Sequence, residues 1–294
     1  MEKKLEKKMD VWGKGNLVRI LKLLFWISLL PFVSVQGRII KVLAIGNSFS
    51  EDAVEQNLYE LAVVGGDTLI IGNVYRPGQS LQSHWKMAIA EETFEYRKIV
   101  NGKKTNVRKK MHECITDENW DYITFQQASY DSGLLKSYEP WLSNLLEYVK
   151  RYVTNSTVKM GLHQTWAYAQ NSTHTGFSVY GNSQVNMYQA IVTAVSVTAQ
   201  RHANEIVFVV PSGTAIQNLR NTSVGDTLCR DGYHLSLGLG RYTAACTWLE
   251  IITGQNPETN SYKPSALTEQ EALLARKAAH AAVLYPYVSV EVDE

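Results

Sequence analysis

The chain has 294 residues, which is long enough for one large domain or two small ones. Apolar residues make up 45% of it, as in globular proteins that bury a core, and its formal net charge is only +1. Beyond residue 37 the chain holds 22 basic and 25 acidic residues, so its composition gives no indication of a nucleic-acid partner.

The N-terminal segment has the pattern of a secretory signal. Seven Lys and Arg residues precede the apolar run Leu23–Leu30, and Pro31 and small residues follow as far as Gly37. The run is short for a membrane span and has the length of a signal's apolar core. We expect residues 1–37 to be removed and the protein to be exported to the periplasm or the extracellular space, without stable membrane insertion. An uncleaved N-terminal anchor is the alternative.

The first predicted strand of residues 38–294 is Val42–Ile45, which ends in the turn Gly46-Asn47-Ser48. A helix is expected to follow from about Glu51 to Val64. A serine between a first strand and a helix lies where α/β folds bind ligands or hold a nucleophile. The simpler interpretation is that Ser48 or Ser50 only caps the helix, while Asn47 shapes the turn.

Strands and helices then alternate along the chain. Further strands are predicted at 67–75, 121–126, 158–164 and 205–211, and helices at 114–119, 140–153, 182–202, 214–219, 237–253 and 268–284. Such alternation predicts a mainly parallel sheet with helices on both faces. We expect one domain over residues 38–294, an α/β three-layer sandwich with five strands in a flavodoxin-like order. Segments 93–100 and 103–110, joined by Asn101-Gly102, predict a β-hairpin inserted outside the parallel sheet.

A candidate base for Ser48 follows the last predicted strand, in Asp231-Gly232-Tyr233-His234. A spacing of three residues on a turn allows the carboxylate of Asp231 to orient the imidazole of His234 and to stabilise its protonated form. The carboxyl ends of parallel strands share one edge of the sheet, so this segment is expected near Ser48.

The two blocks together resemble the SGNH hydrolase superfamily of GDSL-like esterases. More narrowly, the chain is similar to an exported branch common in gut Bacteroidetes. The shared features are Gly46-Asn47-Ser48-Phe49-Ser50, the Gln-Gln at the end of the third strand, and Asp231-Gly232-Tyr233-His234. The resemblance covers residues 40 to about 255. It implies Ser48 as the catalytic nucleophile, His234 as the base and Asp231 as the residue that orients the base.

The resemblance also implies an oxyanion site. The backbone N–H groups of Ser48 and Gly78 are expected to contribute to it. The superfamily normally has a Gly-x-Asn-Asp block, but this chain has Phe125-Gln126-Gln127 there. A Gln amide can donate the same hydrogen bond, and the sequence does not distinguish Gln126 from Gln127.

Several residues near the strand ends are candidates for substrate binding. They are His84 and Trp85 after Gly78, and Gln164 and Trp166 at the end of the fourth strand. His163, at the same strand end, either borders the pocket or is a satisfied core histidine. The aromatic residues of the loop 165–181 either stack on sugar rings or pack beneath their own loop. The basic run Lys103–Lys110 is either a solvated hairpin or a surface that attracts acidic glycans.

No group of residues has metal-ligand spacing, and no cofactor is expected. The odd number of cysteines (Cys114, Cys229 and Cys246) allows at most one internal disulfide. The expected function is that of a serine esterase that removes O-acetyl groups from carbohydrate, its partner being a small-molecule or glycan ester. A lipase or thioesterase of the same fold, and a non-catalytic glycan-binding protein, are the alternatives.

Overall fold

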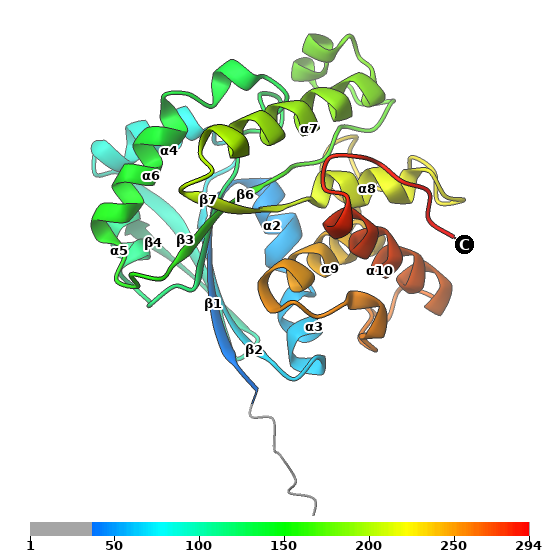
Figure 1. The fold of residues 1–294 in the computed structure, drawn as a ribbon, viewed down its shortest axis with the longest axis horizontal. Coiled ribbons are helices and arrows are strands. Elements are labelled where there is room, and N and C mark those ends of the chain that lie inside the picture. Colours follow the sequence, from blue (N-terminus) through cyan, green and yellow to red (C-terminus); the bar gives the residue numbers. More distant parts are fainter. Residues whose placement is uncertain (1–36, 294) are drawn as a thin grey trace, which may run out of the picture. The chain divides into compact units, whose positions relative to one another are not determined.

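The computed structural model describes residues 37–293, so most of the predicted signal lies outside the described residues. One seven-stranded sheet forms the centre of this region, in the order β4-β3-β2-β1-β5-β6-β7 (Figure 1). Its strands are β1 (Ile39–Gly46), β2 (Thr68–Tyr75), β3 (Thr93–Val100), β4 (Lys103–Lys110), β5 (Tyr122–Phe125), β6 (Lys159–His163) and β7 (Ile206–Val210).

Five of the strands are parallel, in the order β2-β1-β5-β6-β7. This is the flavodoxin-like order expected from the sequence. The apolar run of β1 explains its central place, because Val42, Leu43, Ala44 and Ile45 are all buried. The carboxyl ends of β1 and β7 therefore lie at the same edge of the sheet, which brings the two candidate blocks together.

The expected count of five strands is wrong, because the hairpin is part of the sheet. β3 and β4 pair with each other, and β3 pairs antiparallel with β2 from Ile70 opposite Val100 to Tyr75 opposite Glu95. The alternation along β3 places Phe94 and Tyr96 in the core. The hairpin thus extends a mixed sheet and makes β4 its edge strand.

Helices cover both faces of the sheet (Figure 1). On one face lie α2 (Ser48–Val54), α3 (Leu58–Val64), α9 (Leu239–Thr253) and α10 (Glu269–Leu284), with α8 (Ser212–Arg220) packed against α9 and α10. On the other lie α4 (Leu81–Ile89), α5 (Met111–Ile115), α6 (Trp141–Tyr152) and α7 (Gln184–Arg201). Three short 3₁₀ helices, η1 (Leu135–Ser137), η2 (Thr175–Tyr180) and η3 (Pro257–Thr259), complete the described region.

Some helix boundaries differ from the predictions. The single helix expected over 51–64 is two helices, because Asn57 has φ 64 and interrupts it. The sequence did not predict α4, and α5 begins at Met111 instead of Cys114. None of the helices within 37–293 is both long and apolar enough to cross a membrane.

The three cysteines are free thiols. Cys114 and Cys246 are buried, as expected for small apolar side chains, and Cys229 is partly buried.

Candidate active site

Ser48 is the first residue of α2 and follows β1 after a single residue, Asn47. Asn47 is the N-cap, since its side chain accepts a hydrogen bond from the backbone N–H of Phe49 at 3.0 Å. Gly46 is required at the turn because a Cβ there would lie 2.5 Å from Ser50 Oγ. The capping role therefore belongs to Asn47, and the hydroxyl of Ser48 is directed elsewhere.

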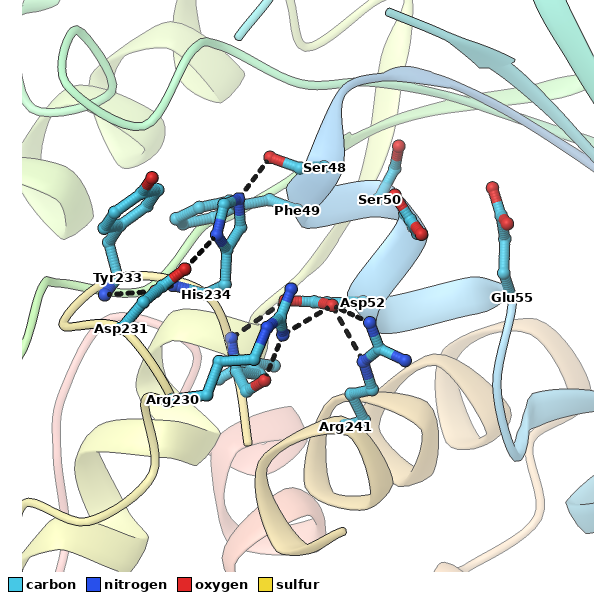
Figure 2. Close-up of polar contacts among 12 residues, drawn as sticks. Ser48, Phe49, Ser50, Asp52, Glu55, Arg230, Asp231, Tyr233, His234 and Arg241 are labelled. Atoms are coloured by element: carbon cyan, nitrogen blue, oxygen red, sulfur yellow. Dashed lines mark hydrogen bonds and ion pairs between the residues drawn. The ribbon is translucent and has the colours of Figure 1, made fainter. Parts of the chain in front are cut away.

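That hydroxyl meets His234, as Figure 2 shows. Ser48 Oγ lies 2.8 Å from His234 Nε2, and His234 Nδ1 lies 2.7 Å from Asp231 Oδ2. The other oxygen of Asp231 accepts from the backbone N–H groups of Tyr233 at 3.2 Å and His234 at 2.8 Å. An ionised Asp231 can only accept, so Nδ1 carries the proton and Nε2 is left to accept from Ser48.

The charge on Asp231 is supported by these contacts. Partial burial on its own would raise the pKa of the carboxyl group. The hydrogen bonds from the side chain and backbone of His234 outweigh that effect and hold the pKa of Asp231 below its usual range.

The segment that carries Asp231 and His234 is attached to α2 by a buried carboxylate, that of Asp52. Asp52 accepts from Arg230 at 3.1 Å, from the backbone N–H of Leu235 at 2.8 Å, and from Arg241 on α9 at 2.8 Å (Figure 2). The sequence did not predict a role for Asp52. The available signal was its position one helical turn after Ser48, on the same side of α2.

Trp166 supports the site from beneath and does not face a substrate. It is fully buried, stacks on Phe49 with ring centroids 4.2 Å apart, and donates from Nε1 to the carbonyl of Tyr233 at 2.7 Å. Phe49 follows Ser48 and Tyr233 precedes His234. Trp166 thus joins the two halves of the site, and the prediction that it binds substrate is wrong.

A buried chain of hydrogen bonds runs from the turn to β6 and α8. Gln126 donates to Asn47 Oδ1 at 2.6 Å and accepts from His163 Nδ1 at 2.7 Å, while His163 Nε2 accepts from Ser212 at 3.0 Å. Asn47 Oδ1 must be an acceptor because it also binds the N–H of Phe49, and this fixes every donor along the chain. Burial lowers the pKa of His163 to about 3, so this ring is the neutral core histidine that the sequence allowed.

Gln127 is turned away from Ser48. Its amide donates to the carbonyl and hydroxyl of Ser137 at 2.9 and 3.0 Å, and its oxygen accepts from the N–H groups of Leu81 and Ala128. Both ends of the side chain are therefore used to join α4 to the loop after β5. Of the two glutamines, only Gln126 reaches the turn that carries Ser48.

Three other candidates for substrate binding lie in the protein core or pack between helices. His84 is fully buried and stacks on Phe94, and burial lowers its pKa to about 4. Trp85 packs edge-on against Tyr148 of α6. Gln164 is buried and binds Thr214 and the carbonyl of Pro286. Burial of His84 and Gln164 contradicts their predicted roles, because position after a strand does not tell which way a side chain points. Trp85 is partly exposed, so its role in substrate binding stays a prediction.

Gly78 lies on an exposed loop with φ +62, a conformation that favours glycine. The loop is held against the nucleophile turn, because Asn47 Nδ2 donates to the carbonyl of Gln79 at 3.0 Å. Gly78 is thus one residue from a direct contact with the turn.

The aromatic residues of the loop 165–181 mostly pack beneath it. Tyr168 and Phe177 are fully buried and Tyr180 is nearly so. The partly exposed rings beside His234 are instead Tyr233, 4.2 Å from it between centroids, His174, 4.9 Å from Tyr233, and Tyr130, 6.2 Å from His174. Burial, together with the nearby His234, lowers the pKa of His174.

The chain belongs to the family described as "Domain of unknown function (DUF4886)", whose model matches residues 41–282 and so spans the site. A crystal structure of a DUF4886 family protein from Bacteroides uniformis is 46% identical, with a TM-score of 0.83 over 86% of this chain and 98% of that chain.

Two more distant structures are similar over about three quarters of the chain. Axe2, an acetylxylan esterase from Geobacillus stearothermophilus, is 15% identical, with a TM-score of 0.47 over 74% of this chain and 96% of that one. TesA is 11% identical, with a TM-score of 0.47 over 73% and 98%. No curated protein matches the sequence.

Proposed function

We propose that this protein is a serine esterase, with Ser48 as nucleophile, His234 as general base and Asp231 as the residue that orients the base. One observation carries the proposal: the two hydrogen bonds of 2.8 and 2.7 Å that connect Ser48 to His234 and His234 to Asp231. A serine hydroxyl is a weak nucleophile until a neighbouring base removes its proton, and this chain of contacts supplies that base.

The proposed reaction has two halves. Ser48 Oγ attacks the ester carbonyl as His234 Nε2 takes its proton, and Asp231 stabilises the imidazolium that forms. His234 then gives the proton to the leaving alcohol, which departs and leaves an acyl group on Ser48. Water repeats the attack with the same base and releases the acid and the free serine.

The negative oxygen formed in each half requires hydrogen-bond donors. We assign this role to the N–H of Ser48, to the N–H of Gly78 and to the side chain of Gln126. The N–H of Ser48 lies in the first turn of α2, where N–H groups have no partner within the helix. Gln126 donates one amide hydrogen to Asn47, and its amide nitrogen carries a second hydrogen. Gln127 has no such role because Ser137 holds its amide.

O-acetyl groups on carbohydrate are the substrates that we propose. Three partly exposed rings form a row that begins beside His234: Tyr233, then His174, then Tyr130. They combine aromatic faces with hydroxyl and imidazole groups. Such a surface suits the C–H faces and hydroxyls of a sugar better than a long acyl chain, which needs an apolar groove. The signal-like segment before residue 38 supports export, where polysaccharide esters are available.

Hydrolysis of esters of different acyl length tests this proposal. We expect the protein to hydrolyse p-nitrophenyl acetate and to release acetate from acetylated xylan, and to hydrolyse long-chain p-nitrophenyl esters far more slowly. Ser48→Ala is the control, which should remain folded by circular dichroism. A preference for long acyl chains would instead support a lipase or thioesterase, and no hydrolysis of any ester would support a binding protein.

A further inference from the structure

The carboxylate of Asp52 lies one helical turn after Ser48 on α2, and its side chain is completely buried. Residues four apart on a helix share one side, so Ser48 and Asp52 both face the segment that carries His234. Figure 2 shows this arrangement, with Arg230 and Arg241 converging on Asp52 below the Ser48–His234 contact.

Two of the groups that bind Asp52 flank the segment 231–234. Arg230 comes immediately before Asp231, and its guanidinium lies 3.1 Å from both oxygens of Asp52. Leu235 comes immediately after His234, and its N–H donates to Oδ2 of Asp52 at 2.8 Å. One carboxylate therefore holds both ends of the four residues that carry the acid and the base.

The backbone closes the same segment into a small ring. The N–H of Arg230 donates to the carbonyl of His234 at 2.8 Å, and Cys229 pairs with Leu235 in an isolated bridge. The segment is thus rigid in itself but lies at the surface, where the side chain of Asp231 is 40% exposed. Two contacts fix it relative to Ser48: the bond of Trp166 to the carbonyl of Tyr233, and the attachment to α2 through Asp52, which holds both ends of the segment.

We propose that Asp52 is a positioning residue that sets the distance between His234 and Ser48. This role rests on the proposed esterase function. Proton transfer from Ser48 to His234 requires hydrogen-bond reach, and a displacement of about 1 Å in an active site can cost about a hundredfold in rate. Without the carboxylate, the segment 231–234 loses the acceptor shared by its two ends, and only the contact of Trp166 with Tyr233 is left to hold the imidazole near the nucleophile.

Glu55, the C-cap residue of α2, provides a matched control. Its side chain is also buried, and it pairs with cations of the hairpin, Arg97 at 3.6 Å and Lys104. Glu55 points away from the segment 231–234 in Figure 2. Loss of its charge removes a buried ion pair at the end of α2 without touching the attachment of His234.

The test compares Asp52→Asn and Glu55→Gln with the wild type in p-nitrophenyl acetate hydrolysis and in labelling by a fluorophosphonate probe. For Asp52→Asn we expect kcat to fall about tenfold to a hundredfold with KM within about twofold of wild type, and labelling to slow in parallel. Glu55→Gln should lower Tm but keep kcat. The role is overturned if folded Asp52→Asn keeps its kcat, or if Glu55→Gln loses as much.

Arg230→Gln serves as the second variant if Asp52→Asn does not fold. The side chain of Arg230 is 33% exposed, and its removal leaves Asp52 paired with Arg241. The same fall in kcat is expected, and an unchanged kcat overturns the role. A wild-type protein that neither hydrolyses the ester nor reacts with the probe overturns the esterase function itself and this role with it.

Discussion

Ser48 is set apart from its neighbours by the partner of its hydroxyl. In the structure Asn47 caps α2, and the hydroxyl of Ser50 lies within hydrogen-bond distance of two acceptors, the carbonyl of Asn47 at 2.7 Å and Asn73 Oδ1 at 2.9 Å. Both side chains therefore serve the turn and the core. Ser48 alone of the three directs its side-chain oxygen to a histidine, at the surface edge of the sheet.

Trp166 gives a test of how the site is held together. Trp166→Phe keeps a ring to stack on Phe49 but loses the hydrogen bond to the carbonyl of Tyr233, and Trp166→Leu loses both contacts. We expect the free energy of unfolding to fall by about 1–2 kcal/mol for Phe and about 3–4 kcal/mol for Leu, by urea titration. Because Tyr233 precedes His234, kcat should fall in the same order. A Phe variant with wild-type stability and kcat would contradict the role of this bond.

Some residues of the site could be predicted from the sequence and others could not. Ser48, Asp231 and His234 could be brought together from their places after strands, because parallel topology puts those ends at one edge. Gln126 and Gln127 are neighbours in an extended chain, so their side chains point to opposite faces and only one of them reaches the turn of Ser48. The sequence does not tell which one. His84, Gln164 and Trp166 were assigned to the substrate although they are buried, and no pattern in the sequence marks that difference.

At the scale of elements, the β-hairpin shows the same limit. Its two strands were predicted with the observed bounds, because Asn101-Gly102 determines the turn and alternation marks β3. The pairing of β3 with β2 was not predicted, because the alternation of apolar and polar residues along a strand does not identify the strand with which it pairs. As the edge strand, β4 is rich in lysine, which discourages pairing with a second sheet.

Asp117 lies between α5 and β5 and binds side chains of both strands of this hairpin, which predicts part of the hairpin's acid sensitivity. Burial would raise its pKa, but hydrogen bonds from Lys109, Lys98 and Tyr96 outweigh this and lower the pKa from 3.8 to about 2. A carboxyl group whose pKa is lower when folded stabilises the fold above its unfolded pKa, and this contribution is lost as the pH falls toward 2.

Asp117→Asn should therefore be less stable than wild type at neutral pH, and the difference should shrink as the pH falls from about 4 to about 2. Urea unfolding of both proteins at several pH values measures this difference. A difference that stays constant over that range would show that the charge of Asp117 does not stabilise the hairpin.

At the scale of the whole molecule, the site depends on contacts between distant parts of the chain. Ser48 and His234 are 186 residues apart in sequence. The parallel strand order brings them to one edge of the sheet, Trp166 packs between their neighbours, and Asp52 joins α2 to the segment 231–234. The sequence predicted the edge, whereas the contacts that hold the two halves in register depend on side-chain directions in the folded core.

If Ser48 is a nucleophile activated by His234, as we propose, a covalent serine probe should react with its hydroxyl oxygen. The wild-type protein is incubated with a fluorophosphonate probe, digested and analysed by mass spectrometry, with His234→Ala as the comparison. We predict one modified site, at Ser48, and labelling slower by at least about a hundredfold in His234→Ala, because the serine hydroxyl then lacks its base. An unmodified Ser48 in the folded wild-type protein, or equal labelling of the two proteins, would contradict this proposal.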